Sequence, residues 1–257
     1  MRDNRTKRIM LSGGLALGVS LTIPDPFVTE VAGGAGFDFV LIDAEHSPIA
    51  VDQLQVMLIA LRSSPSTVLV RPAANDPALI KQALDLGAEG LVVPEVDDAA
   101  ACAAAVAAAR YPPLGRRGFG PRRAARLDGG RPAYLARADE EVAVLVMIES
   151  AAAVAGIDAI LKTPGLDGIM VGPADLAATM GHLSDPSHPD IRSAVTDVRD
   201  ACERHSVPFG IFTATEQAAR DWAAAGARFM TVGADTQFID QGLAKSRALA
   251  LALRESR

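Results

Sequence analysis

Short apolar segments alternate with alanine-rich segments along the whole chain, in about eight repeats. The apolar segments are continuous, as expected for strands buried on both faces of a parallel sheet that helices cover. We expect strands at 15–21, 37–42, 67–70, 90–93, 142–148, 168–171, 208–211 and 229–232. We expect helices at 26–35, 51–62, 77–86, 99–110, 151–161, 191–205, 215–225 and 238–254. Eight such units in 257 residues favour a closed (β/α)₈ TIM barrel, forming a single domain over residues 1–257, over an open doubly wound sheet.

Charge and cysteine content exclude some classes of protein. A net charge of −6 argues against a nucleic-acid-binding protein, whose binding face is normally basic. The chain has two cysteines, Cys102 and Cys202, too few for a disulfide framework. We therefore expect free thiols and a cytoplasmic protein.

The N-terminus resembles a signal peptide, because basic residues precede the apolar stretch 9–23. That stretch contains Gly13, Gly14 and Gly18, however, and no small-residue cleavage site follows it. We interpret residues 1–13 as an N-terminal extension of the barrel. No uninterrupted apolar run is long enough to span a membrane, so no membrane association is expected.

The segment 110–134 breaks the repeat, with six arginines among prolines and glycines after Arg110. It is either a solvated surface loop or a functional one, such as an anion-facing lid or a subunit contact. Loops of this length in compact domains are usually functional. The sequence leaves both interpretations open.

Polar residues gather where the predicted strands end, which is where barrel enzymes place their chemistry. Glu149 follows strand 142–148 directly, and Asp175 follows strand 168–171 through Gly172-Pro173-Ala174. Carboxylates suit Mg²⁺ or Mn²⁺, which prefer oxygen ligands. Either acid could instead cap the next helix, although Ser150 is the better cap beside Glu149. For Asp235, which follows the last strand, capping and a role in the site stay equally open.

Three further features of the strand ends point to chemistry. His46 can act as a general base, and Arg71 can stabilise a developing oxyanion. The backbone N–H groups from Gly172 to Asp175, at the start of a helix, offer a site for a substrate carboxylate. None of the four lysines lies at a strand end, where a Schiff-base lysine would have to meet a carbonyl substrate.

Several motifs together resemble the HpcH/HpaI family of class II pyruvate-dependent aldolases, over roughly residues 14–250. The resemblance lies in Ala35-Gly36-Phe37-Asp38-Phe39, Ile42-Asp43-Ala44-Glu45-His46, Val70-Arg71-Pro72, Asn75-Asp76-Pro77, Gly90-Leu91-Val92-Val93-Pro94, Arg110-Tyr111-Pro112-Pro113, Ile148-Glu149, Gly168-Ile169-Met170-Val171-Gly172-Pro173-Ala174-Asp175-Leu176 and Val232-Gly233-Ala234-Asp235-Thr236. It implies a TIM barrel that reversibly cleaves 4-hydroxy-2-oxoacids to pyruvate, or hydroxypyruvate, and an aldehyde through a metal-bound enolate.

The resemblance also implies a role for each matching residue. Glu149 and Asp175 would bind the divalent metal, Mg²⁺, Mn²⁺ or Co²⁺, and the backbone of Ala174 and Asp175 would hold the substrate carboxylate. Arg71 would stabilise the enolate, and His46 would take part in proton transfer.

Asp85 would raise the basicity of the catalytic histidine, and the family usually forms hexamers. Asp85 lies in the last turn of helix 77–86, about 12 Å below the helix start at a rise of 1.5 Å per residue. This places it far from His46 of its own chain, so the histidine it serves should belong to a neighbouring subunit. We also expect the C-terminal helix, 238–257, to pack on a neighbouring subunit.

Two positions depart from the family pattern. Met147 stands where many members have glutamine, and it shares the inward face of its strand with Glu149. Ser20 stands where many members have tryptophan. With Phe212 at the end of strand 208–211, these residues form the predicted wall of the substrate site. We expect them to affect which substrate is accepted, and not the class of reaction.

Two alternatives remain. A malyl-CoA or citramalyl-CoA lyase would share the metal carboxylates, but such chains are larger and carry a CoA-binding extension. A catalytically silent barrel that serves as a binding module should have lost its strand-end polar residues, yet His46, Arg71, Glu149 and Asp175 are all present.

Overall fold

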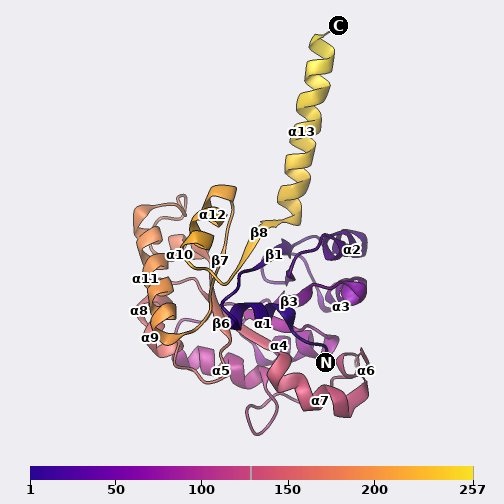
Figure 1. Cartoon of the computed structure of the whole chain (residues 1–257), viewed down its shortest axis with the longest axis vertical. Coiled ribbons are helices and arrows are strands. Elements are labelled where there is room, and N and C mark those ends of the chain that lie inside the picture. Colours follow the sequence, from indigo (N-terminus) through magenta and orange to yellow (C-terminus); the bar gives the residue numbers. More distant parts are fainter. Residues whose placement is uncertain (128, 257) are drawn as a thin grey trace.

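The structure is a computed structural model that describes residues 1–127 and 129–256. Eight parallel strands form a closed barrel in chain order, with β8 returning to pair with β1 (Figure 1). The strands are β1 (Ala16–Leu21), β2 (Phe39–Asp43), β3 (Thr67–Arg71), β4 (Gly90–Val93), β5 (Ala143–Ile148), β6 (Gly168–Val171), β7 (Phe209–Phe212) and β8 (Phe229–Ala234). The predicted single-domain (β/α)₈ barrel is confirmed.

The eight predicted helices are present with small shifts of their ends. They are α2 (Pro26–Gly34), α3 (Val51–Ala60) with a 3₁₀ turn (Leu61–Ser63), α4 (Pro77–Leu86), α5 (Ala99–Ala109), α8 (Ala151–Ala155) with α9 (Ile157–Ile160), α11 (Pro189–His205), α12 (Glu216–Ala224) and α13 (Asp235–Glu255). The predicted helix 151–161 is divided at Gly156, which ends α8 and begins α9.

Within residues 1–127 and 129–256, four further helices were not predicted: α1 (Arg5–Leu11), α6 (Ala124–Leu127), α7 (Gly130–Glu141) and α10 (Pro173–Thr179). Two of them correct the interpretation of 110–134 as one loop, because α6 and the start of α7 lie inside it. Pro132 sits in the first turn of α7, where a missing N–H costs no intrahelical bond. Arg117 is also not solvated, since its side chain is fully buried.

The N-terminal extension closes the end of the barrel where the strands begin. Asn4 caps α1 by accepting from Lys7 N at 2.9 Å, and its amide donates to the Glu89 and Glu141 carbonyls before β4 and β5. Met10 of α1 packs into the barrel interior. The segment that resembles a signal peptide therefore forms part of the folded barrel.

The barrel interior is a small apolar core separate from the layer between strands and helices. Phe39 and Phe229 are fully buried in it. Their rings occupy space that a side chain on Gly18 or Gly210 would need, because a Cβ at either glycine would lie less than 3.0 Å from the ring. Glycine at these two positions lets the two large rings fill the barrel interior.

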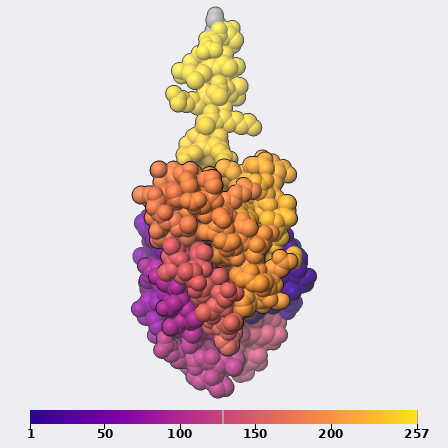
Figure 2. Space-filling view, turned by 90° about the vertical axis from the view of Figure 1, so that its left-hand side faces the viewer, coloured from indigo at the N-terminus to yellow at the C-terminus, as the bar shows by residue number. Residues whose placement is uncertain are grey.

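Helix α13 extends away from the barrel instead of packing against it (Figures 1 and 2). Asp235 is its one buried residue among those described. Many of its apolar side chains are exposed: Phe238, Ile239, Leu243, Leu249, Leu251 and Leu253. Among the described residues, no helix is both long and apolar enough to cross a membrane.

Candidate active site

A cavity of about 560 Å³ opens where the strands end. Its lining includes Ser20, Asp43, Arg71 and Ala174, and it continues between α11 and α12. Catalytic groups of barrel enzymes lie at this end. Part of the predicted strand-end site therefore lines this cavity, namely Ser20, Arg71, Pro173, Ala174 and Phe212.

Arg71 is held in one orientation by the neighbouring strand. The register of β2 and β3 places Asp43 beside Arg71, and Arg71 Nε and Nη2 donate to the two Asp43 carboxylate oxygens at 2.9 and 2.6 Å. The two side chains are only 8% and 5% exposed. Burial alone would raise the pKa of Asp43, but the hydrogen bonds and charge of Arg71 outweigh it and lower that pKa. Asp43 thus stays ionised and fixes the guanidinium as a two-point pair.

The third nitrogen of the same guanidinium faces Glu45. Arg71 Nη1 lies 3.0 Å from Glu45 Oε2, and the Glu45 side chain is 12% exposed. Burial raises the pKa of Glu45 to about 7; the Arg71 charge opposes that shift, and the Glu149 charge adds to it. Glu45 Oε2 accepts no well-directed hydrogen bond. Glu45 is therefore an acid that can gain or lose its proton near neutral pH.

Glu149 is a buried carboxylate with one oxygen satisfied and one not. Its Oε1 accepts from the backbone N–H of Glu95 at 2.7 Å, and Glu95 has the left-handed φ of 57° that turns this N–H toward it. Its Oε2 is buried without a hydrogen-bond partner. Ser150, not Glu149, caps α8 by accepting from Ala153 N. The capping interpretation of Glu149 is therefore wrong.

The acids around Glu149 make this spot suitable for a divalent cation. Burial raises the pKa of Glu149, and the negative charge of Asp175 adds to the shift. A bare buried oxygen beside a second carboxylate is the arrangement that a hard cation would satisfy. Gly172 keeps the spot open, because a Cβ there would lie 3.3 Å from Glu149 Oε2 and 2.8 Å from Met147 Cε. The residues present fit the metal site predicted for Glu149 and Asp175.

The His46 imidazole lies near the carboxylates of both Glu45 and Asp175. His46 Nε2 is 3.6 Å from Glu45 Oε2 and 4.0 Å from Asp175 Oδ2, and its side chain is 58% exposed. Asp175 lies in the first turn of α10, where Pro173 has no N–H and the first intrahelical bond is donated by Leu176. Helix geometry leaves the N–H groups of Ala174 and Asp175 free for a substrate oxygen.

Two of the three predicted wall residues, Ser20 and Phe212, line this cavity. Ser20 is 7% exposed and lines the cavity together with Phe212. The Phe212 ring lies 5.2 Å from the Arg71 guanidinium carbon. Met147 is fully buried in the barrel interior, on the inward face predicted for it.

Asp85 is the one predicted site residue that does not lie near His46, Arg71 and Glu149 at the strand ends. Its carboxylate accepts from Arg117 Nη2 at 2.8 Å, and the same nitrogen reaches the Tyr134 hydroxyl at 3.0 Å. Arg117 also lies over the Tyr111 ring, 4.6 Å from its centroid. Within the chain, Asp85 therefore belongs to a cluster on the Arg-rich segment.

Sequence reasoning assigned no role to Asp43, Glu45 or Glu95, which hold Arg71 and Glu149 in place. Aligning the ends of β2 and β3 would have paired Asp43 with Arg71, whereas no sequence signal marks the backbone turn at Glu95. The role of Asp235 is also apparent only from the structure. Its carboxylate accepts from Thr22 N, Thr22 Oγ1 and Ile23 N at 2.7–2.8 Å, tying the loop after β1 to the end of β8.

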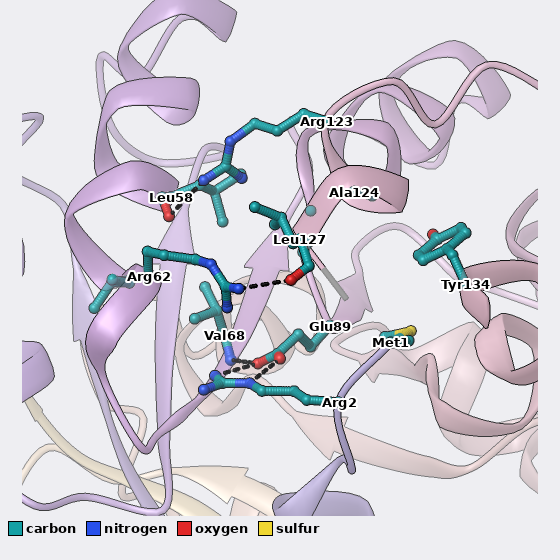
Figure 3. A pocket seen from close by; sticks show the side chains of 13 residues that line it. Met1, Arg2, Leu58, Arg62, Val68, Glu89, Arg123, Ala124, Leu127 and Tyr134 are labelled. Atoms are coloured by element: carbon teal, nitrogen blue, oxygen red, sulfur yellow. Dashed lines mark hydrogen bonds and ion pairs between the residues drawn. The ribbon is translucent and has the colours of Figure 1, made fainter. Parts of the chain in front are cut away.

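A smaller cavity of about 40 Å³ lies at the opposite end of the barrel (Figure 3). Figure 3 shows Glu89 bound by Arg2 and by the backbone N–H of Val68, and Arg62 donating to the Leu127 carbonyl. Features at the start of barrel strands serve stability. This cavity therefore does not compete with the strand-end site.

Comparison with known proteins identifies relatives over nearly the whole chain. The family model for HpcH/HpaI aldolase/citrate lyase matches residues 18–241. A hydroxypyruvate/pyruvate aldolase of Pseudomonas aeruginosa is 41% identical over 242 residues, covering 93% of this chain and 90% of the relative. A 5-keto-4-deoxy-D-glucarate aldolase of Klebsiella pneumoniae is 39% identical over 232 residues, covering 90% of this chain and 91% of the relative.

A solved structure agrees with these relatives. An HpcH/HpaI aldolase/citrate lyase family protein from Burkholderia cenocepacia superposes with a TM-score of 0.89 at 37% identity, covering 99% of both chains. The predicted enzyme class, a carbon–carbon lyase of the aldolase type, is confirmed along with the predicted family. The chain belongs to the HpcH/HpaI aldolase/citrate lyase family.

Proposed function

We propose that this aldolase reversibly cleaves 4-hydroxy-2-oxoacids to an aldehyde and pyruvate or hydroxypyruvate, with a divalent metal held by Glu149 and Asp175. The family is divalent-metal dependent. The observation that carries the assignment to these two residues is Glu149 Oε2, a buried oxygen without a hydrogen-bond donor beside a second carboxylate. Mg²⁺, Mn²⁺ and Co²⁺ all suit such oxygen ligands.

A divalent cation at this position supplies Lewis acidity that polarises the 2-oxo group of the substrate. The chain's own groups then divide the remaining tasks. The N–H groups of Ala174 and Asp175, next to Gly172 and Pro173, bind the substrate carboxylate.

Arg71 stabilises the negative charge that develops on the 2-oxo oxygen when the C3–C4 bond breaks. Its Nε and Nη2 are occupied by Asp43, so the guanidinium is oriented before the substrate arrives. Preorganised donors of this kind commonly contribute a factor of about 10²–10³ in rate. His46 takes the proton of the 4-hydroxyl group, and its exposed imidazole is free to exchange that proton with water.

Ser20, Met147 and Phe212 shape the space for the aldehyde. The cavity continues past Phe212 along Ile191, Val195, Ala218 and Trp222, which is a mostly apolar path. An apolar wall of this kind distinguishes substrates by about 1–3 kcal/mol. We therefore propose a preference for aldehydes with an extended, weakly polar tail.

The working enzyme is a homo-oligomer, most simply a hexamer, in which α13 packs on a neighbouring subunit. Helix α13 has 21 residues, exposes apolar side chains and stands clear of the barrel (Figure 2). Several large apolar side chains exposed along one helix are typical of a protein–protein contact. In this assembly Asp85 serves His46 of a neighbouring subunit. The buried free thiols of Cys102 and Cys202 suit a reducing cytoplasm.

A retro-aldol screen coupled to lactate dehydrogenase tests the substrate class. The purified enzyme with added Mg²⁺ should release pyruvate from several 4-hydroxy-2-oxoacids. It should not cleave malyl-CoA or citramalyl-CoA. Cleavage of the CoA esters alone would favour the CoA lyase alternative. Failure on every substrate would favour a catalytically silent barrel.

A further inference from the structure

Arg117, on the Arg-rich segment 110–134, has a fully buried side chain. Its guanidinium carbon lies 4.6 Å from the centroid of the Tyr111 ring and 5.8 Å from that of the Tyr134 ring. Its Nη2 donates to Asp85 Oδ1 at 2.8 Å and to the Tyr134 hydroxyl at 3.0 Å, whereas its Nε and Nη1 are buried without a hydrogen-bond partner. Two aromatic rings therefore hold the guanidinium in place, and Asp85 is its one carboxylate partner among the described residues.

The Asp85 carboxylate is held at one oxygen and open at the other. Its Oδ1 accepts from Arg117, while no described residue donates a hydrogen bond to Oδ2. The Asp85 side chain is 20% exposed, although its partner is fully buried. Arg117 therefore fixes the carboxylate from below and leaves one oxygen at the surface.

A second buried arginine, Arg110, shows the contrast. Its partner Asp167 uses both oxygens within the chain: Oδ2 accepts from Arg110 Nη2 at 2.9 Å and from Val144 N at 2.8 Å. Oδ1 of Asp167 lies 2.8 Å from Lys7 Nζ. The Arg110 pair is thus fully engaged inside the chain, whereas Asp85 keeps an oxygen available for a group outside it.

Stability alone gives little reason for the pair between Arg117 and Asp85. Asp85 lies in the last turn of α4, where the partial negative charge of the helix end opposes a carboxylate. Replacing a buried ion pair by apolar residues often leaves stability unchanged or raises it. Positions at which a local preference is overruled in this way are concentrated at functional sites.

We propose that Arg117 is a positioning residue for the aldol reaction, which fixes Asp85 so that its free Oδ2 meets His46 of a neighbouring subunit. The proposal rests on the role proposed above for Asp85 in the assembly. The His46 side chain is 58% exposed in the single chain, so its imidazole is open to a group from outside. Arg117 itself touches neither substrate nor metal, and it acts only through Asp85.

Steady-state kinetics give the first test. Arg117→Met keeps the length of the side chain but removes its charge and its donors. We expect kcat to fall at least about 10-fold with little change in KM, because a misplaced group costs rate and not substrate binding. Arg117→Lys should be more active than Arg117→Met, since an ammonium group can still pair with Asp85. Adding Arg117→Met to Asp85→Asn should cause no further loss, because both changes remove the same interaction.

The matched control is Arg110→Met, which removes the other buried arginine, whose side chain is 5% exposed. It should lower Tm but keep the wild-type kcat, because its partner Asp167 offers no oxygen to another subunit. Thermal melting of every variant is recorded alongside its kinetics. Should Arg117→Met fail to fold, Arg117→Gln takes its place in each measurement, with the same expected results.

Mixed oligomers provide a readout that a merely structural role of Arg117 would not affect. Chains with Arg117→Met and chains with His46→Ala, unfolded together and reassembled, should regain activity. Some interfaces then combine the intact Arg117 and Asp85 of one chain with the intact His46 of another. Chains with Arg117→Met mixed with chains with Asp85→Ala should stay impaired, because neither chain supplies both members of the pair.

The mixture of His46→Ala with Asp85→Ala separates the role of Arg117 from that of the assembly. Recovery in this mixture but not in the mixture of His46→Ala with Arg117→Met would overturn the positioning role of Arg117 and leave the assembly standing. A wild-type kcat in Arg117→Met would do the same. If neither mixture recovers activity, the proposed subunit arrangement is wrong, and the positioning role falls with it.

Discussion

The pair between Asp43 and Arg71 gives a prediction whose magnitude follows from burial. Asp43→Ala removes one partner of a buried ion pair, which typically costs about 3–5 kcal/mol. Glu45 remains 3.0 Å from Arg71 Nη1 and still partners its charge, so the loss should lie near the lower end, about 3 kcal/mol. For a chain of this size, 1 kcal/mol shifts Tm by about 2–4 °C. We therefore expect Tm to fall by about 6–12 °C.

The assay is thermal unfolding followed by circular dichroism, with all variants at one protein concentration. Asp25→Ala is the control, since Asp25 is an acid that also accepts two backbone hydrogen bonds, from Phe27 and Val28, but on the surface. Losing that helix cap should cost about 1 kcal/mol. Asp25→Ala should keep its activity, whereas Asp43→Ala should lose about 10²-fold in kcat/KM as Arg71 loses its orientation.

A double variant distinguishes stability from chemistry. Asp43→Leu combined with Arg71→Met removes both charges, so it should be more stable than Asp43→Ala alone. It should nevertheless be inactive, because the guanidinium is gone. The reasoning is refuted if Asp43→Ala melts within about 2 °C of the wild type, or if it keeps full activity.

Three further outcomes are expected. Phe212→Ala should change aldehyde preference or stereochemistry while pyruvate methyl exchange continues; loss of exchange would assign Phe212 to the chemistry. His46→Ala and Asp85→Ala should each be impaired and should regain activity when unfolded together and reassembled, because mixed interfaces contain wild-type pairs; inactive mixtures would place Asp85 within its own chain or outside catalysis. The folded-state pKa of Glu45, about 7, lies above the ordinary 4.5. Metal-free protein should therefore lose stability as pH rises between those values, and Glu45→Gln should flatten that slope in urea titrations; an unchanged slope would contradict the burial argument.

The barrel could be predicted because each strand is a short apolar run followed by a segment with a helical pattern, often rich in alanine, and both patterns are local. The positions of Glu149 and Asp175 followed from the same pattern, since carboxyl ends of parallel strands share one face. Alternation along β5 was also enough to place Met147 inside the barrel.

The remaining features depend on contacts between distant segments. Asp43 is paired with Arg71 by strand register, and Glu95 reaches Glu149 through one left-handed residue. Helix α7 begins among glycines and a proline, a composition that predicts a loop. The helix forms nevertheless, because Tyr134 and Ala138 are buried by packing against the rest of the protein.

The central claim is that the chemistry depends on a divalent metal at Glu149 and Asp175, and hydrogen exchange of pyruvate tests it most directly. Metal-stripped enzyme is mixed with pyruvate in D₂O, and loss of the methyl proton signal is followed by NMR with and without Mg²⁺. We predict exchange with Mg²⁺ in the wild type, none after chelation, and none in Glu149→Gln. Exchange in the chelated enzyme, or a lysine adduct trapped by borohydride and pyruvate, would contradict the account.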